Sequence, residues 1–390
     1  MYNFDEQKQL NSVNGALALR PQIEKIVDEF QGAGFENIFF IGIGGTWASA
    51  LQVEIYMKSK SSIPVYVENA AEYLLTGNKK LTDKSVVIFS SVTGSTEEMV
   101  KALDVIKGIG SKIFGFIDKE DSPLVAVCDW CVSYPMNEQL KFYMVANRLM
   151  YNAKEFDAYD RYNKEMEAHL ANALVEVEKK AEAWAEEYAE AKYEYFRKRP
   201  DMPHYFVGAG NQYGATYSYA MCYWEEQLWI RTKSISAGEF FHGMFEIVEA
   251  ETPVTVFLGE DEQRPLAQRV ANFLPRICKN YLLIDTKDYA LEGISEEFRG
   301  SISHLVMMRV NARIDVYLER AFRHPMTIRR YYRQLDYWYE KIHFKWFWGN
   351  ECTVCSTFIW VLSKVNEGMW FKTYRFLGWR TTLLQLLKWF

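Results

Sequence analysis

Cysteine is scarce in this sequence, at 6 of 390 residues, which excludes a small secreted fold held together by disulfides. No N-terminal segment combines a basic start, an apolar run and a small-residue cleavage site, so no secretion signal is expected. The longest charge-free stretch of the C-terminal region, Cys352 to Ser363, is too short to span a bilayer. These absences predict a cytoplasmic protein that makes no use of a membrane.

An excess of basic residues is also missing. The net charge is -6, whereas proteins that bind nucleic acid through its phosphates carry basic surfaces, so nucleic acid is not an expected partner. Hydrophobic residues make up 49% of the chain, which is enough for real cores in two or three domains.

Two Cys-x-x-Cys pairs are present, and spacing alone makes them weak evidence for zinc. Cys128 and Cys131 lie in VAVCDWCVSYP, an alternating apolar run typical of a buried strand. In a strand these two side chains point to opposite faces and do not easily share a metal. Cys352 and Cys355 form the second pair. We interpret the cysteines as structural thiols and expect neither a metal nor an organic cofactor.

Short apolar strands alternate with helical segments over residues 1–155. Residues 5–30 have the periodicity of helices, with an apolar stripe at Leu19, Ile23, Ile26, Val27 and Phe30. After them, NIFFIGIGG, PVYVEN, SVVIF, KIFGFID and VAVCDWCVSY read as strands separated by helices. This alternation predicts an α/β fold with a parallel sheet and crossover helices.

A second domain repeats the first. Residues 156–200 are rich in Ala, Glu and Lys, which predicts a helical linker. Gly42 and Gly44 then recur 166 residues later as Gly208 and Gly210, and TPVTVFLGEDE restates SVVIFSSVTGS at nearly the same offset. So long a period indicates domain duplication, with residues 201–337 as the second domain.

Residues 338–390 differ from the rest of the chain. They contain seven of the twelve tryptophans and no aspartate, with seven Lys or Arg against three Glu. A basic aromatic tail can bind a partner or a membrane surface. Because no apolar period persists through the segment, we favour the interpretation that it lies outside the fold.

Two loops are predicted to bind phosphate. SSVTGSTEE follows a strand and precedes a helix, where backbone N–H groups and the helix dipole favour an anion. The glycine turn from Gly42 to Thr46 ends another strand, so both loops should open at one edge of the sheet. The alternative is ordinary N-capping by Ser and Thr. The predicted phosphate-binding residues are Gly45, Thr46, Ser91, Thr93, Gly94 and Thr96.

The duplicate has Gly259, Glu260, Asp261 and Glu262 at the position of the second loop. Carboxylates at a helix start stabilise the helix but repel phosphate, so we expect one phosphate site per chain.

Acid–base residues are predicted in the second domain. Glu225 and Glu226 lie on a helix rich in Tyr, Trp and Leu, and His242 follows a Ser-Ala-Gly turn. A carboxylate among apolar neighbours suits a general base, and histidine is the other natural proton carrier near neutral pH. The alternative is a solvated carboxylate and a packing histidine.

The motifs GIGGT, SVTGST and GEFFHGMFEIVE, with HPMTIRRYYRQLDY, resemble the SIS (sugar isomerase) domain family. The sequence is similar to the isomerase half of glucosamine-6-phosphate synthase and more closely to fructoselysine-6-phosphate and fructosamine deglycases. The resemblance implies two tandem SIS domains, each a five-stranded parallel sheet flanked by helices, in a homodimer or larger oligomer. It implies that Glu226 is the catalytic base, that His242 is the ring-opening acid, and that Thr46, Ser91, Thr93 and Thr96 hold phosphate.

The resemblance further implies hydrolysis of a 6-phosphorylated Amadori compound to glucose 6-phosphate and a free amine or amino acid. The synthase uses a lysine near its C-terminus. HPMTIRRYYRQLDY contains no lysine, and the deglycases lack this lysine too. The alternatives are a phosphosugar aldose–ketose isomerase, an amino-sugar phosphate deaminase, and a non-catalytic sugar-phosphate sensor. The sequence does not identify the amine that is released.

Overall fold

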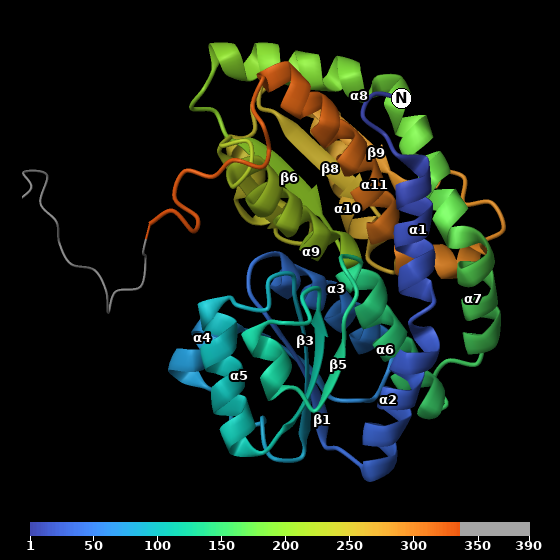
Figure 1. Ribbon diagram of the computed structural model, residues 1–390. Helices are drawn as coiled ribbons and strands as arrows, with labels where there is room; N and C mark the ends of the chain where they lie inside the picture. The colour runs from blue at the N-terminus through green and yellow to red at the C-terminus, as the bar shows by residue number, and fades with distance from the viewer. Residues whose placement is uncertain (336–390) are drawn as a thin grey trace, which may run out of the picture. The chain divides into compact units, whose positions relative to one another are not determined.

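The computed structural model describes residues 1–335 (Figure 1). Met1–Ile328 form one compact unit, which contains all the helices and strands of the described residues. A second unit begins at Arg329, and its described residues, 329–335, contain bends and turns. The expectations for residues 338–390 and for Cys352 and Cys355 fall outside the described part of the chain.

Two helices open the chain, as the apolar stripe predicts. They are α1 (Glu6–Leu17) and α2 (Arg20–Ala33). The Asp5 side chain caps α1 by accepting a hydrogen bond from the Lys8 N–H, and proline occupies the first turn of α2. The apolar face of α2, which carries Ile23 and Val27, is buried.

The first sheet is parallel and has five strands in the order β2-β1-β3-β4-β5, which confirms the expectation for this half of the chain. Its elements are β1 (Asn37–Gly42), α3 (Gly45–Lys60), β2 (Val65–Asn69), α4 (Ala70–Thr76), β3 (Ser85–Ser91), α5 (Glu97–Ile109), β4 (Lys112–Ile117), η1 (Pro123–Val127) and β5 (Trp130–Val132). The chain order reverses between β1 and β3, and this reversal is where open α/β sheets bind ligands.

Both faces of this sheet are buried, as its apolar strands require. Ile38 and Phe40 of β1 point to the face covered by α2, α3 and α6, whereas Phe39 and Ile41 point to the face covered by α5. The sheet is therefore a rigid platform for the loops that leave its carboxyl edge.

A long helical segment lies between the two sheets. It comprises α6 (Glu138–Asn152), α7 (Tyr159–Glu165), the π-helical turn η2 (Met166–Leu170) and α8 (Ala171–Lys198). Pro200, two residues beyond α8, prevents the helix from continuing. Although α8 has 28 residues, no helix within residues 1–335 is apolar enough over its length to cross a membrane.

The second sheet repeats the strand order of the first as β7-β6-β8-β9, which supports the predicted duplication. Its elements are β6 (His204–Gly208), α9 (Asn211–Ser218), the π-helical turn η3 (Tyr219–Glu225), β7 (Thr232–Ser236), η4 (Phe240–His242), η5 (Met244–Ile247), β8 (Val254–Leu258), α10 (Arg264–Phe273), η6 (Leu274–Arg276), β9 (Tyr281–Asp285), η7 (Thr286–Asp288) and α11 (Glu296–Phe322).

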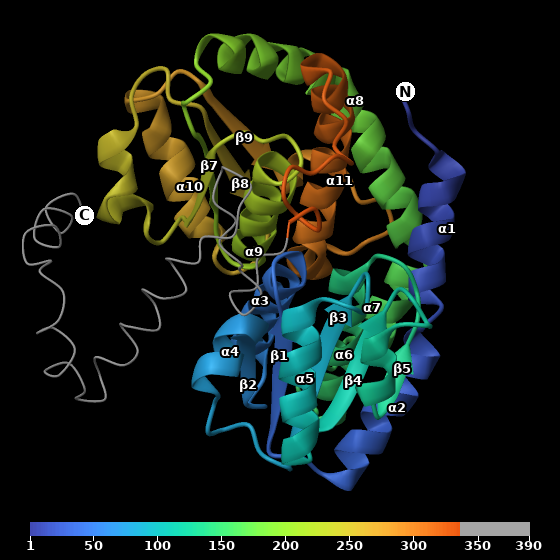
Figure 2. The same ribbon diagram turned by 60° about the vertical axis from the view of Figure 1, so that its left-hand side comes forward.

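The expectation of five strands in this sheet is wrong, because the described residues form four. After β9 the chain reads TKDYALEGIS, which has no apolar run and whose last residue, Ser295, is the N-cap of α11. The 27-residue α11 packs along α8, so the chain follows a helix where the first domain forms its last strand (Figure 2).

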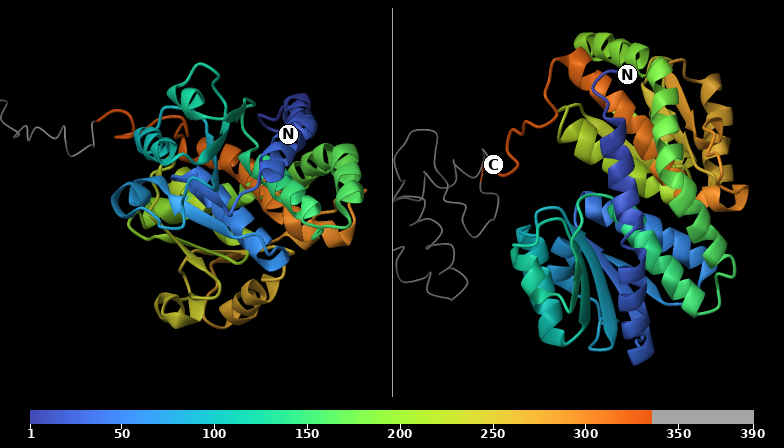
Figure 3. Two further views of the ribbon diagram at one scale, coloured as in Figure 1. Left: turned by 90° about the horizontal axis from the view of Figure 1, so that it is seen from below. Right: turned by 45° about the vertical axis from the view of Figure 1, so that its right-hand side comes forward.

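The two halves share one core within Met1–Ile328. Phe40 of β1 and Phe206 of β6 belong to the same cluster of buried apolar side chains. Helix α1 contacts both α6 and α8 (Figure 3), and α3 packs against α9 across the boundary between the sheets. This contact between α3 and α9 positions the candidate site.

Candidate active site

A glycine turn connects β1 to α3 in the first domain. Gly44, at the N-cap of α3, has φ of 59°, and a Cβ on Gly42 would lie 2.6 Å from the Trp47 backbone nitrogen. The Thr46 hydroxyl closes the turn, since it donates to the Ile43 carbonyl at 3.1 Å and accepts the Ile43 N–H at 3.3 Å. The turn brings the chain sharply into α3, whose N-terminus has no side-chain capping hydrogen bond.

The second loop connects β3 to α5. Buried Ser91 accepts the Gly94 N–H at 3.0 Å, and Gly94 has φ of 60°. A Cβ on Gly94 would lie 1.9 Å from Ser122 Oγ, so only glycine fits. Thr96 is the N-cap of α5, but its side chain makes no capping hydrogen bond. The hydroxyl groups of Thr96 and Ser91 can both donate a hydrogen bond to an anion bound at this helix start.

The structure brings these two loops together. Strands β1 and β3 are parallel neighbours with Ile41 opposite Phe89, so the loops that follow them leave the same edge of the sheet. That edge is the reversal point of the strand order, where two helix N-termini face outward. Gly45, Thr46, Ser91, Gly94 and Thr96 therefore lie on adjoining turns. Thr93 lies between them on the second loop.

Helix α9 of the second domain and its continuation η3 pack on the glycine turn. Where a side chain on Gly45 would begin, the nearest atoms are Cys222 Sγ and Ser218 Oγ, each at 3.7 Å. Burial raises the pKa of the Cys222 thiol to about 11, and the carboxylates of Glu226 and Glu138 add to the rise. Glu226 follows Cys222 by four residues at the end of η3, and the Glu138 carboxylate accepts a hydrogen bond from Ser49 of α3.

The structure distinguishes Glu226 from Glu225. Glu226 is half-buried at the end of η3, where its N–H donates to the Met221 carbonyl at 2.9 Å. Glu225 is exposed, and its carboxylate accepts the Thr232 hydroxyl at 2.6 Å. Glu225 is thus tied to the start of β7, which leaves Glu226 as the better placed carboxylate.

His242 ends the short 3₁₀ turn η4 and is exposed. Its backbone N–H donates to Glu239, and Gly243 follows with φ of 148°. Within residues 1–335 the imidazole makes no hydrogen bond, and its exposure leaves it open to a group from outside this part of the chain.

The second sheet carries a carboxylate where an anion would bind. Asp261 accepts the N–H of Asn211, the first residue of α9, at 2.7 Å and that of Gln263 at 3.0 Å. A Cβ on Gly210 would lie 2.1 Å from the Asp261 carboxylate. Because Asp261 already fills this helix N-terminus with negative charge, the geometry favours the prediction of one phosphate site per chain.

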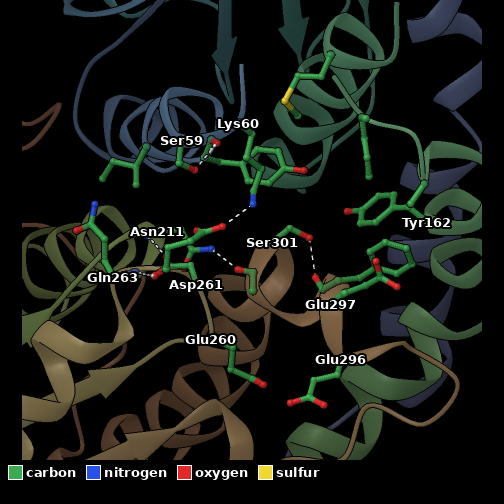
Figure 4. Close-up of a pocket in the computed structure, with 18 of the residues that line it drawn as sticks. Ser59, Lys60, Tyr162, Asn211, Glu260, Asp261, Gln263, Glu296, Glu297 and Ser301 are labelled. Carbon is green, nitrogen blue, oxygen red and sulfur yellow. Dashed lines mark hydrogen bonds and ion pairs between the residues drawn. The ribbon is translucent and has the colours of Figure 1, made fainter. Parts of the chain in front are cut away.

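A pocket of about 970 Å³ adjoins Asp261 at this edge (Figure 4). Two lysines line it, Lys60 and Lys287, against seven carboxylates, which belong to Glu155, Asp157, Glu260, Asp261, Glu262, Glu296 and Glu297. Lys60 is paired with Glu262, and Arg299 with Glu260. The remaining negative charge makes this pocket unsuited to a phosphorylated sugar.

The strand expected through Cys128 and Cys131 is wrong over its first half. Pro123 begins the 3₁₀ turn η1, and β5 covers only Trp130–Val132. Cys128 Sγ donates to the Leu124 carbonyl at 3.2 Å, and the interaction of its thiol with that of Cys131 raises the pKa of Cys128 and lowers that of Cys131. Within residues 1–335 no three His, Cys, Asp or Glu side chains gather as metal ligands.

Glu138 and Lys141, which the sequence patterns do not single out, lie on α6 near this edge of the first sheet. Glu138 is the first residue of α6, and its carboxylate accepts the Ser49 hydroxyl at 3.4 Å. Lys141 is fully buried, and its Nζ donates to the Tyr134 carbonyl at 2.8 Å. An acidic residue that opens a helix is so common that its position carries no functional signal by itself.

Part of the chain matches a known domain family. Residues 34–150 match the family model described as SIS domain. The second half repeats the strand order of this domain, so the fold fits two tandem domains of this type.

Two relatives match most of this chain. The chain is 27% identical over 328 residues to the fructosamine deglycase FrlB of Bacillus subtilis (strain 168), a match that covers 81% of this chain and 97% of that protein. It is 26% identical over 317 residues to the fructoselysine 6-phosphate deglycase of Escherichia coli (strain K12), with 80% and 90% covered. A Bacillus subtilis crystal structure, described as that of a candidate phosphosugar isomerase, superposes with a TM-score of 0.76 at 25% identity and covers 83% of this chain and 99% of that one.

Proposed function

We propose that this protein hydrolyses a 6-phosphorylated Amadori compound, such as fructoselysine 6-phosphate, to glucose 6-phosphate and a free amine or amino acid. The packing of η3, which Glu226 follows, on the Gly45 turn supports the proposal, because the reaction needs a base near the predicted phosphate loops. The names of the similar deglycases support the substrate class.

The 6-phosphate would anchor the sugar at the two helix N-termini of the first domain. The hydroxyls of Ser91 and Thr96 and the open start of α3 offer hydrogen-bond donors without a strong cation. Such an arrangement holds an anion by oriented N–H and O–H groups and by the helix dipoles. Thr46 shapes the turn through its bonds with Ile43.

The reaction is a sequence of proton transfers. His242 protonates the ring oxygen while the C2 hydroxyl releases its proton to water, so that the ring opens to the ketoamine. Glu226 then removes a proton from C1 to form the enolamine. Glu226 returns this proton to C2, which gives the imine between C1 and the nitrogen. Water adds to C1 and the amine leaves. Because the nitrogen is part of the substrate, this sequence needs no lysine to supply one.

His242 would act in a second copy of the chain. The imidazole is exposed and lacks a hydrogen bond within the described residues, whereas a ring-opening acid has to reach the substrate. A homodimer or larger oligomer, in which His242 of one chain completes the site of another, satisfies both conditions. This arrangement predicts that a monomeric variant loses ring-opening activity.

A substrate panel tests the proposal. Fructose-amine 6-phosphates carrying lysine, aspartate or other amines are incubated with the protein, and glucose 6-phosphate is assayed with a coupled dehydrogenase. We expect release from at least one phosphorylated adduct and little release from its unphosphorylated form. Interconversion of phosphosugars without hydrolysis would instead favour an isomerase. Binding of sugar phosphate without any turnover would favour a sensor.

A further inference from the structure

Glu138 is held in place by an unusual backbone turn. Met136 and Asn137, directly before it, both have positive φ, at 60° and 57°. Asparagine adopts this conformation readily, but methionine does so only at a cost in free energy. The Met136 N–H donates to Asp118 at 3.1 Å, and the Asn137 side chain donates to Ser12 Oγ at 3.0 Å. These bonds hold the turn, and the turn fixes where α6 begins.

The turn places the Glu138 carboxylate against the candidate active site. The Ser49 hydroxyl lies 3.4 Å from Glu138 Oε1 and also 3.1 Å from the Gly45 carbonyl oxygen. Gly45 in turn borders Cys222 of η3, the helical turn that leads to Glu226. Glu138 of the first domain and Glu226 of the second thus approach the glycine turn from different elements.

The charged and titratable groups around Glu138 come from three elements. Lys141 lies one turn along α6, Asp118 follows β4, and Cys222 and Tyr223 belong to η3. Burial raises the pKa of the Glu138 carboxyl and Asp118 adds to the rise, while Lys141 and the Ser49 hydroxyl oppose it. The net effect favours the protonated form, which is the form that a general acid needs.

We propose that Glu138 is the general acid that works opposite Glu226 in the reaction proposed above. As Glu226 removes the proton from C1, Glu138 donates its proton to the C2 oxygen, so that the carbonyl becomes the enol hydroxyl. After Glu226 has returned its proton to C2, the nitrogen carries one proton too many, as an iminium ion. Glu138 takes that proton, which regenerates its acid form and leaves the neutral imine. Neither carboxyl gains or loses a proton over the cycle.

Glu138→Gln tests this role, because the amide preserves the shape of the side chain but cannot release a proton. Glu155→Gln is the matched control, since Glu155 also accepts serine hydroxyls, from Ser61 and Ser62, but lies away from the glycine turn. Glu138→Asp retains the acid on a shorter side chain. For each variant, kcat is measured from pH 5 to 10, together with the melting temperature and the affinity for glucose 6-phosphate.

We expect Glu138→Gln to lower kcat about 10²-fold and to abolish the decline of kcat at alkaline pH, with melting temperature and affinity unchanged. Glu138→Asp should recover part of the rate and keep the alkaline decline, and Glu155→Gln should behave as wild type. The assignment is overturned if Glu138→Gln stays within threefold of wild type with the same pH profile. It is also overturned if a lower melting temperature of Glu138→Gln accounts for the whole loss of rate.

A second assay separates this inference from the proposed function on which it rests. Fructose 6-phosphate in deuterium oxide reports exchange at C1 by NMR, and this exchange needs the acid and the base but no Amadori nitrogen. If the wild type exchanges deuterium but hydrolyses no adduct, the deglycase proposal fails. The role of Glu138 is then supported or overturned by the exchange rate of Glu138→Gln. Absence of both activities in the wild type overturns both proposals.

Discussion

Gly214 of α9 lies against Ala48 of α3 so closely that a Cβ on this glycine would be 2.5 Å from the Ala48 carbonyl oxygen. No side chain fits there without moving one helix, because the obstructing atom belongs to the backbone. Helix α3 begins at the glycine turn, and α9 leads through η3 to Glu226. The distance between the phosphate loops and the candidate base therefore depends on this contact.

Gly214→Ala should impair activity at a position that has no chemical role. The added methyl group has to push α9 away from α3, and displacement of a catalytic group by about 1 Å can cost roughly 10²-fold in rate. Gly108→Ala is the control, because nothing lies within 4 Å of the Cβ that it adds. We expect kcat and the melting temperature to fall for Gly214→Ala alone, and equal behaviour of the two variants would contradict this.

Glu226→Gln should abolish turnover and leave sugar-phosphate binding intact. Loss of a general base lowers the rate by about 10²-fold or more, whereas the phosphate loops lie on the other domain. Glu225→Gln provides the control, since its carboxylate is exposed and bonded to Thr232. Turnover and binding of glucose 6-phosphate by calorimetry test both variants. Near-normal turnover by Glu226→Gln would refute the assignment.

Thr96→Val should raise KM for the phosphorylated substrate. Valine keeps the shape of threonine but removes its hydroxyl, which the helix cap does not use, so little stability should be lost. A hydrogen bond to a charged group contributes about 1.5–3 kcal/mol, which predicts a KM increase of roughly tenfold or more. Combining it with Ser91→Ala should raise KM further. The same KM as wild type in both variants would place the phosphate elsewhere.

Asp315→Asn should change how stability depends on pH. Burial raises the pKa of Asp315 to about 8, although the Tyr219 hydroxyl bonds to its carboxylate at 2.8 Å. Between pH 4 and 8 the unfolded chain ionises this group while the folded chain keeps it protonated. Stability due to the group is therefore complete below about pH 4 and is lost as pH rises towards 8, at about 1.4 kcal/mol per unit.

The amide does not titrate, so Asp315→Asn should flatten this decline and stabilise the protein at pH 8 relative to wild type. Asp104→Asn, at an exposed position on α5, is the control. Denaturant unfolding at pH 5 and at pH 8 gives the two free energies for each variant. If wild type and Asp315→Asn lose the same free energy between these pH values, Asp315 is not held protonated in the fold.

Periodicity and turn chemistry allowed much of the fold to be predicted. The stripe at Ile23, Val27 and Phe30 indicates α2, and the repeat of Gly42 as Gly208 indicates two domains with the same strand order. Such local patterns reflect burial and backbone freedom, which depend on neighbours in the chain. The fifth strand of the second sheet was wrongly expected because the repeat weakens after β9, where the chain continues towards α11.

The sequence by itself predicted the loops proposed to hold a phosphate, because the glycines and hydroxyls that shape a strand-to-helix turn are local to it. It also drew attention to Glu226 through its family resemblance. Only the tertiary structure decided which of two adjacent glutamates lies at the glycine turn and that Asp261 fills the equivalent position in the second domain. It also decided that Glu138 lies beside Ser49, which is 89 residues away in the chain. Contacts of this kind depend on how α3, α6 and α9 pack together, and packing across such separations leaves no periodic signal in the sequence.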